Sequence, residues 1–206
     1  MQDVRFGVFL RPGASGIAQL RRHVQTAEQS GFDYVSIQDH PYIDDFLDTL
    51  TLTANLAADT SWIRLMPNVA NLALRPAPML AKASATIDIL SEGRFELGLG
   101  GGRLGADRRA RRAAVESRRD RRGHPRGDRD ASDALRLRRG GHYPLVEAQA
   151  GPRPAHRIGI WLGVAGPRML DLLGRKADGW IARLSTSFET KPAGQDRIDA
   201  AARARS

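Results

Sequence analysis

The sequence contains no cysteine and no long hydrophobic run. Without cysteine, a disulfide framework, a thiolate metal site and a cysteine nucleophile are all excluded. No apolar run approaches the roughly 20 residues that a membrane helix needs, and the N-terminus, with Asp3 and Arg5, lacks the apolar block of a secretory signal. We therefore expect a soluble, cytoplasmic protein without a membrane partner, and we assign no metal ligands.

Acidic residues are too few to balance the basic ones, but the imbalance is local. The chain has 32 Lys and Arg against 23 Asp and Glu, a formal charge of +9 at pH 7. Residues 103–140 hold fourteen arginines, no lysine and six acidic residues, which is +8, so the rest of the chain is nearly neutral. Excess positive charge ordinarily indicates nucleic acid or an anionic membrane as a partner. Here the excess positive charge is confined to residues 103–140, so it does not indicate such a partner for the whole protein.

Outside that segment, short apolar runs alternate with stretches of helical periodicity. Apolar runs bounded by Gly, Pro or Asp predict strands, and apolar residues three and four apart predict helices. Ser15 is predicted to cap the first helix and Gly31 to end it. The predicted strands are residues 4–10, 34–38, 63–69, 95–99, 158–163 and 180–182. The predicted helices are residues 16–30, residues 45–59, one opened by Pro76, one opened by Gly166 and Pro167, and residues 196–205.

Regular alternation of strands and helices favours an α/β fold with a parallel sheet, because each parallel connection needs a crossover. The strands are apolar without clean alternation, which is typical of a sheet covered on both faces. A barrel and a doubly wound sheet both meet this condition, and periodicity does not separate them. We treat residues 1–206 as a single domain.

Four groups of residues together carry a family resemblance. They are QDHPY at 38–42, LMPNVANL at 65–72, GRFELGLG at 93–100, and IWLG at 160–163 followed by GPRML at 166–170 and ADGW at 177–180. In this order they resemble the bacterial luciferase-like oxidoreductases, a group that uses FMN or the deazaflavin F420. The resemblance covers about residues 4–102 and 141–182, and a single glycine cluster without the others would be a weak signal.

The resemblance implies a (β/α)8 barrel of the TIM type, with its chemistry at the carboxyl ends of the strands. About six of the eight strands are recognisable, so we expect a truncated barrel without strands seven and eight. Exposed sheet edges would then favour homo-oligomers or aggregation. The site of such a chain need not be active.

Two residues are predicted to be catalytic, His40 and Asp39. His40 follows the second strand, where related F420 enzymes present an active-site histidine, and an imidazole there would donate or accept a proton. The neighbouring Asp39 makes a pair that favours F420 over FMN. The alternative is a histidine that only hydrogen-bonds its neighbours, with Asp39 fixing its tautomer.

The resemblance places the cofactor against the same rim of the barrel. The residues expected to contact it are Asn68, Val69, Gly98, Gly100, Gly101, Gly163, Ala165 and Gly166. Asn68–Val69 aligns with a non-prolyl cis peptide of the family, the glycines permit close backbone approach, and a helix starting after Gly166, with Arg168 beside it, attracts a phosphate. The alternatives are a trans strand end, a flexible loop and an ordinary helix start.

Residues 103–140 interrupt the family pattern. They contain almost no Ile, Val or Phe, which predicts an irregular or disordered insert. They also lack the aromatic side chains that stack on bases, so nucleic acid is not the expected partner. Arg, Ala, Gly, Asp, Ser and His are what GC-rich DNA encodes when read out of frame. We favour a frame-shifted stretch over a nucleic-acid arm or plain divergence.

The sequence thus predicts a luciferase-like oxidoreductase or monooxygenase that depends on F420 or FMN. Hydride would pass between the cofactor and a small organic substrate, with or without oxygen as a co-substrate. The alternative is a non-catalytic α/β remnant whose basic arm binds nucleic acid.

Overall fold

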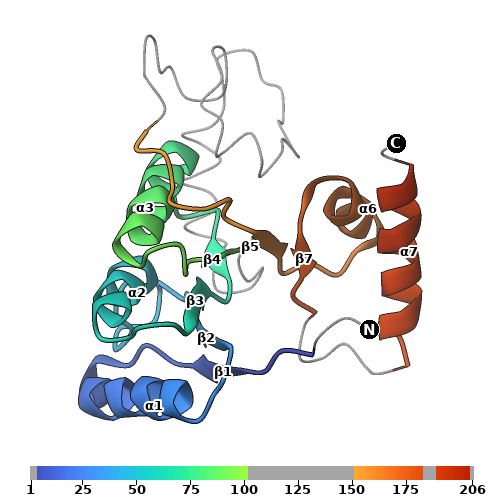
Figure 1. Cartoon of the computed structure of the whole chain (residues 1–206). Helices are drawn as coiled ribbons and strands as arrows, with labels where there is room; N and C mark the ends of the chain where they lie inside the picture. Colours follow the sequence, from blue (N-terminus) through green and yellow to red (C-terminus); the bar gives the residue numbers. More distant parts are fainter. Residues whose placement is uncertain (1–3, 102–150, 183–188, 205–206) are drawn as a thin grey trace.

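The computed structural model describes residues 4–101, 151–182 and 189–204, which form alternating strands and helices (Figure 1). The predicted insert at residues 103–140 lies outside these ranges. The first part contains β1 (Gly7–Leu10), α1 (Ile17–Gln29), β2 (Tyr34–Ile37), α2 (Thr49–Ala58), β3 (Arg64–Pro67), β4 (Ala70–Asn71), α3 (Ala77–Leu90) and β5 (Leu97–Gly100). The second contains β6 (Ile160–Leu162), α6 (Pro167–Lys176), β7 (Gly179–Trp180) and α7 (Lys191–Arg203).

The strands follow one another in space in the order of the sequence. One sheet has the order β1-β2-β3 and the other β4-β5-β6-β7, and all the pairings are parallel. A parallel bridge between Leu65 and Phe95 joins β3 to the start of β5, so the two sheets form one curved row. A doubly wound sheet reverses its strand order at a switch point, whereas this row does not. The observed order is that of a partial (β/α)8 barrel.

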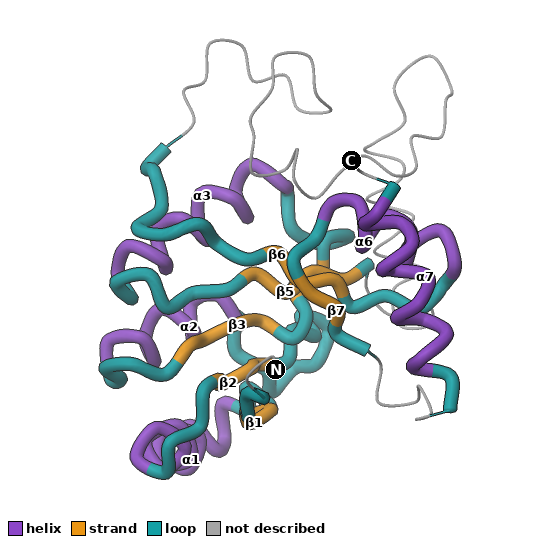
Figure 2. The backbone as a smooth tube through the Cα atoms, turned by 45° about the vertical axis from the view of Figure 1, so that its right-hand side comes forward, coloured by secondary structure: helices purple, strands orange, loops and turns teal. Residues whose placement is uncertain are grey.

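The helices lie along the outer side of this row, with α1, α2 and α3 beside β1 to β5 and with α6 and α7 beside β7 (Figures 1 and 2). Two apolar clusters fill the space between helices and strands. The first, under α1 and α2, contains Leu20, Val24, Ala27, Val35, Ile37, Leu52, Leu56, Ala57, Ile63 and Leu65. The second, under α3 and α6, contains Leu50, Ala70, Leu80, Ile87, Phe95, Leu97, Leu99, Ile158, Ile160, Leu162, Val164, Leu173 and Ile198.

The helix starts correct some of the sequence predictions. Ser15 does not cap α1, because a 3-10 turn at Ala14–Gly16 comes first and the Ser15 side chain bonds Asp45. Helix α2 begins at Thr49, not at residue 45, and its N-cap is Asp48, whose carboxylate accepts the backbone N–H of Thr51. The helix at Pro167 and the left-handed Gly31 after α1 (φ 81°) are confirmed. Capping therefore depends on which side chains the loops engage.

Two charged side chains tie the elements together at the amino ends of the strands. Glu28 at the end of α1 accepts the backbone N–H groups of Ser61, Trp62 and Ile63 at 2.8, 2.8 and 3.0 Å. The Arg94 guanidinium, before β5, donates to the carbonyl oxygen of Ala57 at 2.8 Å, at the carboxyl end of α2. Cations are favoured at that end of a helix. No helix in the described ranges is both long and apolar enough to cross a membrane.

Candidate functional site

Most of the residues predicted for the site lie at the carboxyl ends of β2 to β6. His40 and Asp39 follow β2, Asn68 and Val69 lie between β3 and β4, Gly98 and Gly100 lie in β5 with Gly101 after it, and Gly163, Ala165 and Gly166 lie between β6 and α6. Because the strands are parallel, these ends share one rim. The loop after β2 is joined directly to β4, since the Asp39 carboxylate accepts the Asn71 backbone N–H at 2.8 Å.

Asp39 is buried, and its carboxylate is held by Arg75. The Arg75 Nε and Nη2 donate to the two Asp39 oxygens at 3.0 and 2.8 Å, a bidentate pair, and Nη2 also reaches Asp48 at 2.6 Å. Burial lowers the pKa of the Arg75 guanidinium, but Asp39 and Asp48 outweigh it and hold the pKa above its ordinary value. The Asp39 carboxylate is thus committed to Arg75 and Asn71. It positions the loop that carries His40.

The His40 imidazole is half-buried on the rim and contacts polar and aromatic neighbours. Its Nε2 lies 3.2 Å from the Gln38 amide nitrogen. If that amide nitrogen donates, Nε2 is the acceptor and the imidazole proton is on Nδ1. The imidazole also lies 5.3 Å from the Tyr42 ring and 6.5 Å from the Phe46 ring, centroid to centroid. The neighbour that contacts Nε2 of the imidazole is therefore Gln38, whereas the alternative interpretation of the sequence expected Asp39 to fix the tautomer.

The Asn68–Val69 peptide is cis, as the resemblance implied. It separates β3 from β4 and directs Val69 toward the glycines of the neighbouring strands. A Cβ on Gly100 would lie 2.3 Å from Val69 Cγ2, and one on Gly163 would lie 2.9 Å from Val69 Cγ1. A Cβ on Gly98 would lie 2.1 Å from the Pro67 carbonyl oxygen. These glycines make room for the chain at 67–69, and contact between them and a cofactor remains a prediction.

The outer part of the rim is open. A Cβ added at Gly101 or at Gly166 would meet nothing within 4 Å among the described residues. Ala165 is exposed beside Gly166, and Gly166 precedes α6 without a side-chain cap. Pro167 has no N–H, and the Met169 and Leu170 N–H groups donate to the Gly166 carbonyl oxygen, so in the described part of the chain the Arg168 N–H is the donor left in the first turn of α6. Deeper in the rim, Asn71 is 2% exposed, and in the described part of the chain its Nδ2 has no hydrogen-bond partner. Both features fit a ligand with anionic and carbonyl groups.

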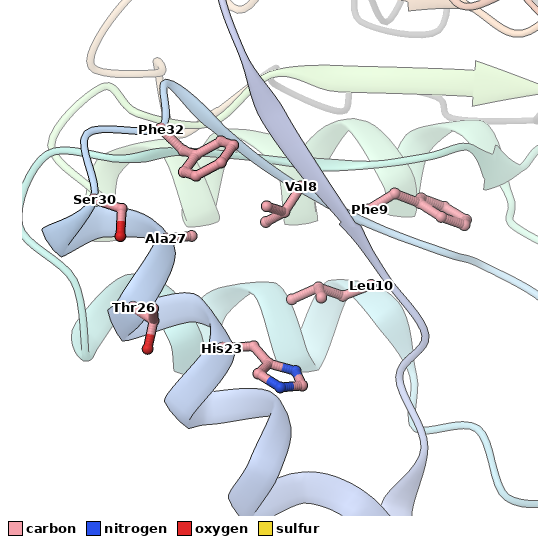
Figure 3. Close-up of a pocket in the computed structure, with 8 residues that line it drawn as sticks. All are labelled: Val8, Phe9, Leu10, His23, Thr26, Ala27, Ser30 and Phe32. Carbon is pink, nitrogen blue, oxygen red and sulfur yellow. The ribbon is translucent and has the colours of Figure 1, made fainter.

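The structure also has a cavity away from this rim. It has a volume of about 420 Å³ and lies between β1 and α1, lined by Val8, Phe9, Leu10, His23, Thr26, Ala27, Ser30 and Phe32 (Figure 3). Val8 and Leu10 point to the α1 side of β1, whereas Phe9 points away from α1. The cavity belongs to the free edge of β1 and not to the carboxyl rim. We do not assign the candidate site to it.

Sequence reasoning missed four residues of this site. Gln38, Arg75, Phe46 and Arg11 were not predicted, although the first two hold His40 and Asp39, and Arg11 lies over the Phe46 ring at 5.3 Å. Only Gln38 had a local signal, since it is two residues before His40 on an extended chain. Arg75 and Phe46 reach the site from other loops, which no local pattern shows.

Comparisons with known proteins identify the family of the chain. A family model described as luciferase-like monooxygenase matches residues 4–206. The 5,10-methylenetetrahydromethanopterin reductase of Methanolobus tindarius is 31% identical over 187 residues, which is 87% of this chain and 54% of the relative. The F420-dependent hydroxymycolic acid dehydrogenase of Mycobacterium tuberculosis is 32% identical over 182 residues, 80% of this chain and 49% of the relative.

The fold has solved counterparts as well. The monooxygenase RslO1 of Streptomyces bottropensis superposes with a TM-score of 0.79 at 20% identity, covering 98% of this chain and 67% of that one. The chain spans about half the length of the curated relatives named above. Given a family match that runs from residue 4 to residue 206, this chain belongs to the luciferase-like monooxygenase family.

Proposed function

We propose that this chain forms the site of an oxidoreductase of the luciferase-like type that uses F420 or FMN. The observation that carries the proposal is the position of His40 on the rim, next to Asp39, whose carboxylate accepts the backbone N–H of Asn71 on the stretch of chain that also carries Asn68 and Val69. One relative supports F420 in particular, because its name is that of an F420-dependent dehydrogenase. The substrate is a small organic molecule.

The residues present fit such a cofactor. Val69, with Gly100 and Gly163 behind it, forms a backing at the centre of the rim, and the Asn71 Nδ2 supplies a buried donor to a ring carbonyl. Gly101, Ala165 and Gly166 carry no side chain or a small one at the outer rim, where the anionic part would lie near the N-terminus of α6. When bound, the cofactor supplies the hydride donor or acceptor.

His40 is assigned the role of the general acid and base of the reaction. With Gln38 donating to Nε2, the neutral imidazole offers Nδ1–H as a hydrogen bond to an oxygen of the bound cofactor or of the substrate. Proton transfer starts from the imidazolium, in which the Gln38 amide turns its oxygen toward Nε2–H, and the neutral imidazole that remains is the base for the reverse step. Asp39 acts through the loop: its bonds to Arg75 and Asn71 hold residues 38–40 against residues 68–71. It is a positioning residue and exchanges no proton.

The proposal is tested by titrating the protein with F420 and with FMN while following fluorescence quenching and the melting temperature. One of the two should bind and raise the melting temperature, because a ligand that binds only the native state stabilises it. His40→Ala should weaken that affinity about three- to tenfold, the effect of losing the hydrogen bond that Nδ1–H offers to the cofactor. His23→Ala, on the exposed face of α1, is the matched control and should leave the affinity unchanged.

Two results would contradict the proposal. If neither cofactor binds, the chain is not a cofactor-dependent enzyme in this form. If a cofactor binds and His40→Ala behaves like His23→Ala, the assignment of His40 is wrong.

A further inference from the structure

Arg11 lies at the carboxyl end of β1, beside the candidate site but outside every residue group discussed for the cofactor. Its guanidinium carbon is 5.3 Å from the centroid of the Phe46 ring. The same ring lies 6.5 Å from the His40 ring, and the Tyr42 ring lies 5.3 Å from that imidazole, centroid to centroid. Phe46 therefore connects a fixed positive charge to the predicted proton-handling residue.

The loops that carry Arg11 and Phe46 are bound firmly to each other. The Ala14 N–H donates to the Asp45 carbonyl oxygen at 2.7 Å, and the Leu47 N–H donates to the Pro12 carbonyl oxygen at 2.8 Å. The Asp45 carboxylate takes both the backbone N–H and the hydroxyl of Ser15, at 3.0 and 3.1 Å. A charge on paired loops is held in place before a ligand arrives, which lowers the entropy cost of binding.

The charge of Arg11 is not neutralised within the described part of the chain. There, no carboxylate lies within ion-pair distance of its guanidinium, and the contact that it makes is with the face of an aromatic ring. A ring under the guanidinium covers one face of the plane and leaves the N–H donors at its edge. Those edge donors match the two oxygens of a carboxylate or phosphate.

Strand geometry places Arg11 on the inner side of the row of strands. Val8 and Leu10 pack on the cluster under α1 and α2, and Phe9 points the opposite way (Figure 3). Arg11 directly follows β1, and the alternation of side chains, continued one residue past Leu10, puts Arg11 on the side of Phe9. The contact of its guanidinium with the Phe46 ring agrees with this direction. That is the side on which His40 and the rim lie.

We propose that Arg11 binds an anionic group, a carboxylate or a phosphate, of the substrate. The substrate would place this group on the guanidinium edge and its reacting atom at His40, with Phe46 and Tyr42 against its body. This assignment rests on the proposed function and adds the substrate class to it. It makes Arg11 a residue that determines specificity for anions, with no role in the chemical step.

The experiment measures binding of three probes of similar size to the full chain by calorimetry at low salt: benzoate, phenyl phosphate and neutral benzamide. At least one anion should bind about tenfold more tightly than benzamide. Arg11→Gln should remove that advantage and leave benzamide within twofold, and Arg11→Lys should retain part of it, because lysine keeps the charge without the fork. Which anion binds distinguishes a carboxylate substrate from a phosphorylated one.

Arg22→Gln, an exposed arginine on α1, is the matched control and should change none of the affinities. Equal affinity for all three probes in the unaltered protein would overturn the inference, as would an unchanged anion affinity in Arg11→Gln with the fold intact by circular dichroism. The same variants are titrated with F420 and FMN. If Arg11→Gln weakens the cofactor and the anions together, Arg11 belongs to the cofactor site and the substrate assignment is wrong.

The cofactor titration separates this inference from the proposed function. Cofactor binding without anion discrimination overturns the role of Arg11 alone, whereas anion discrimination without binding of either cofactor overturns the oxidoreductase proposal and leaves Arg11 as an anion-binding residue.

Discussion

Val69 packs tightly against two glycines of the neighbouring strands on the rim. The side chain of Val69 occupies the space where Gly100 and Gly163 lack a Cβ, with distances of 2.3 and 2.9 Å to the positions that a Cβ would take. Gly101, one residue further along, faces open space. The glycines at 98–101 look alike in the sequence but have different surroundings in the structure. Gly100 makes room for Val69, whereas Gly101 does not, and this difference depends on residues distant in the sequence.

This packing predicts a reciprocal rescue. Gly100→Ala should lower the free energy of unfolding by about 1–3 kcal/mol, because the new methyl overlaps Val69. Val69→Ala removes the overlapping Cγ2, so the double variant Gly100→Ala, Val69→Ala should be less destabilised than the sum of the two single variants. Urea denaturation of the four proteins measures the coupling.

Gly101→Ala is the control for the loss of glycine itself and should stay within about 0.5 kcal/mol of the unaltered protein. Strictly additive effects of Gly100→Ala and Val69→Ala would show that the two residues are not in contact.

The first three helices are tied to the strands at the amino end of the row, opposite the candidate site. Glu28 closes the turn before β3 by accepting three successive backbone N–H groups, which would otherwise lack partners. Burial raises the pKa of Glu28, but the N–H groups of Ile63, Trp62 and Ser61 and the charge of Arg94 outweigh it, so the pKa lies below its ordinary value of 4.5. The charged form of Glu28 is the one that holds the turn.

The pH dependence of stability follows from the direction of that shift. A lowered folded-state pKa means that Glu28 contributes stability above pH 4.5 and loses it as the pH falls through the folded-state value. Glu28→Gln should therefore lower the free energy of unfolding by about 1 kcal/mol at pH 7, and the difference should shrink below pH 4.5. Thermal and urea unfolding between pH 3 and pH 7 measure it.

Glu189→Gln, an exposed glutamate before α7, is the control and should show no such pH-dependent difference. A gap between Glu28→Gln and the unaltered protein that stays constant down to pH 3 would contradict the assigned role.

At the scale of the molecule, β1 is the end strand of its sheet, and in the described ranges it pairs with β2 alone. Apolar side chains accumulate near this edge, with Phe6 63% and Phe9 47% exposed. An unpaired edge with apolar side chains is a template for pairing with another chain. The sequence predicts that exposed barrel edges promote association, and the structure points to β1 as the edge at which to test it.

Sedimentation velocity over a concentration series tests this location. The unaltered protein should show association that rises with concentration, and Phe6→Glu should reduce it by placing a charge beside the edge. Met79→Glu is a matched control, because Met79 is also 63% exposed but lies on α3. Monomer at every concentration, or equal effects of the two variants, would contradict the prediction.

Most elements of the described part were predictable because their signals are local. Short apolar runs located the strands, and helical periodicity located the helices, to within a few residues. Gly31, which has a positive φ, ends α1 as predicted. The helix starts were less predictable. Asp45 was a plausible helix residue in sequence, but its carboxylate is bound by Ser15, and α2 begins only after Asp48.

The sequence alone predicted the parallel βαβ units, because strand period, helix period and turn residues are encoded within short stretches. The rim on which His40, Val69 and Gly166 lie was predicted from the family resemblance and not from those periods. The tertiary structure decided the rest. Strand order separated a barrel from a doubly wound sheet. Packing brought Arg75 to Asp39 across 36 positions and His156 to the fully buried Asp88 across 68. Such pairs depend on how whole elements pack, and a buried charge finds its partner only when the core has formed around it.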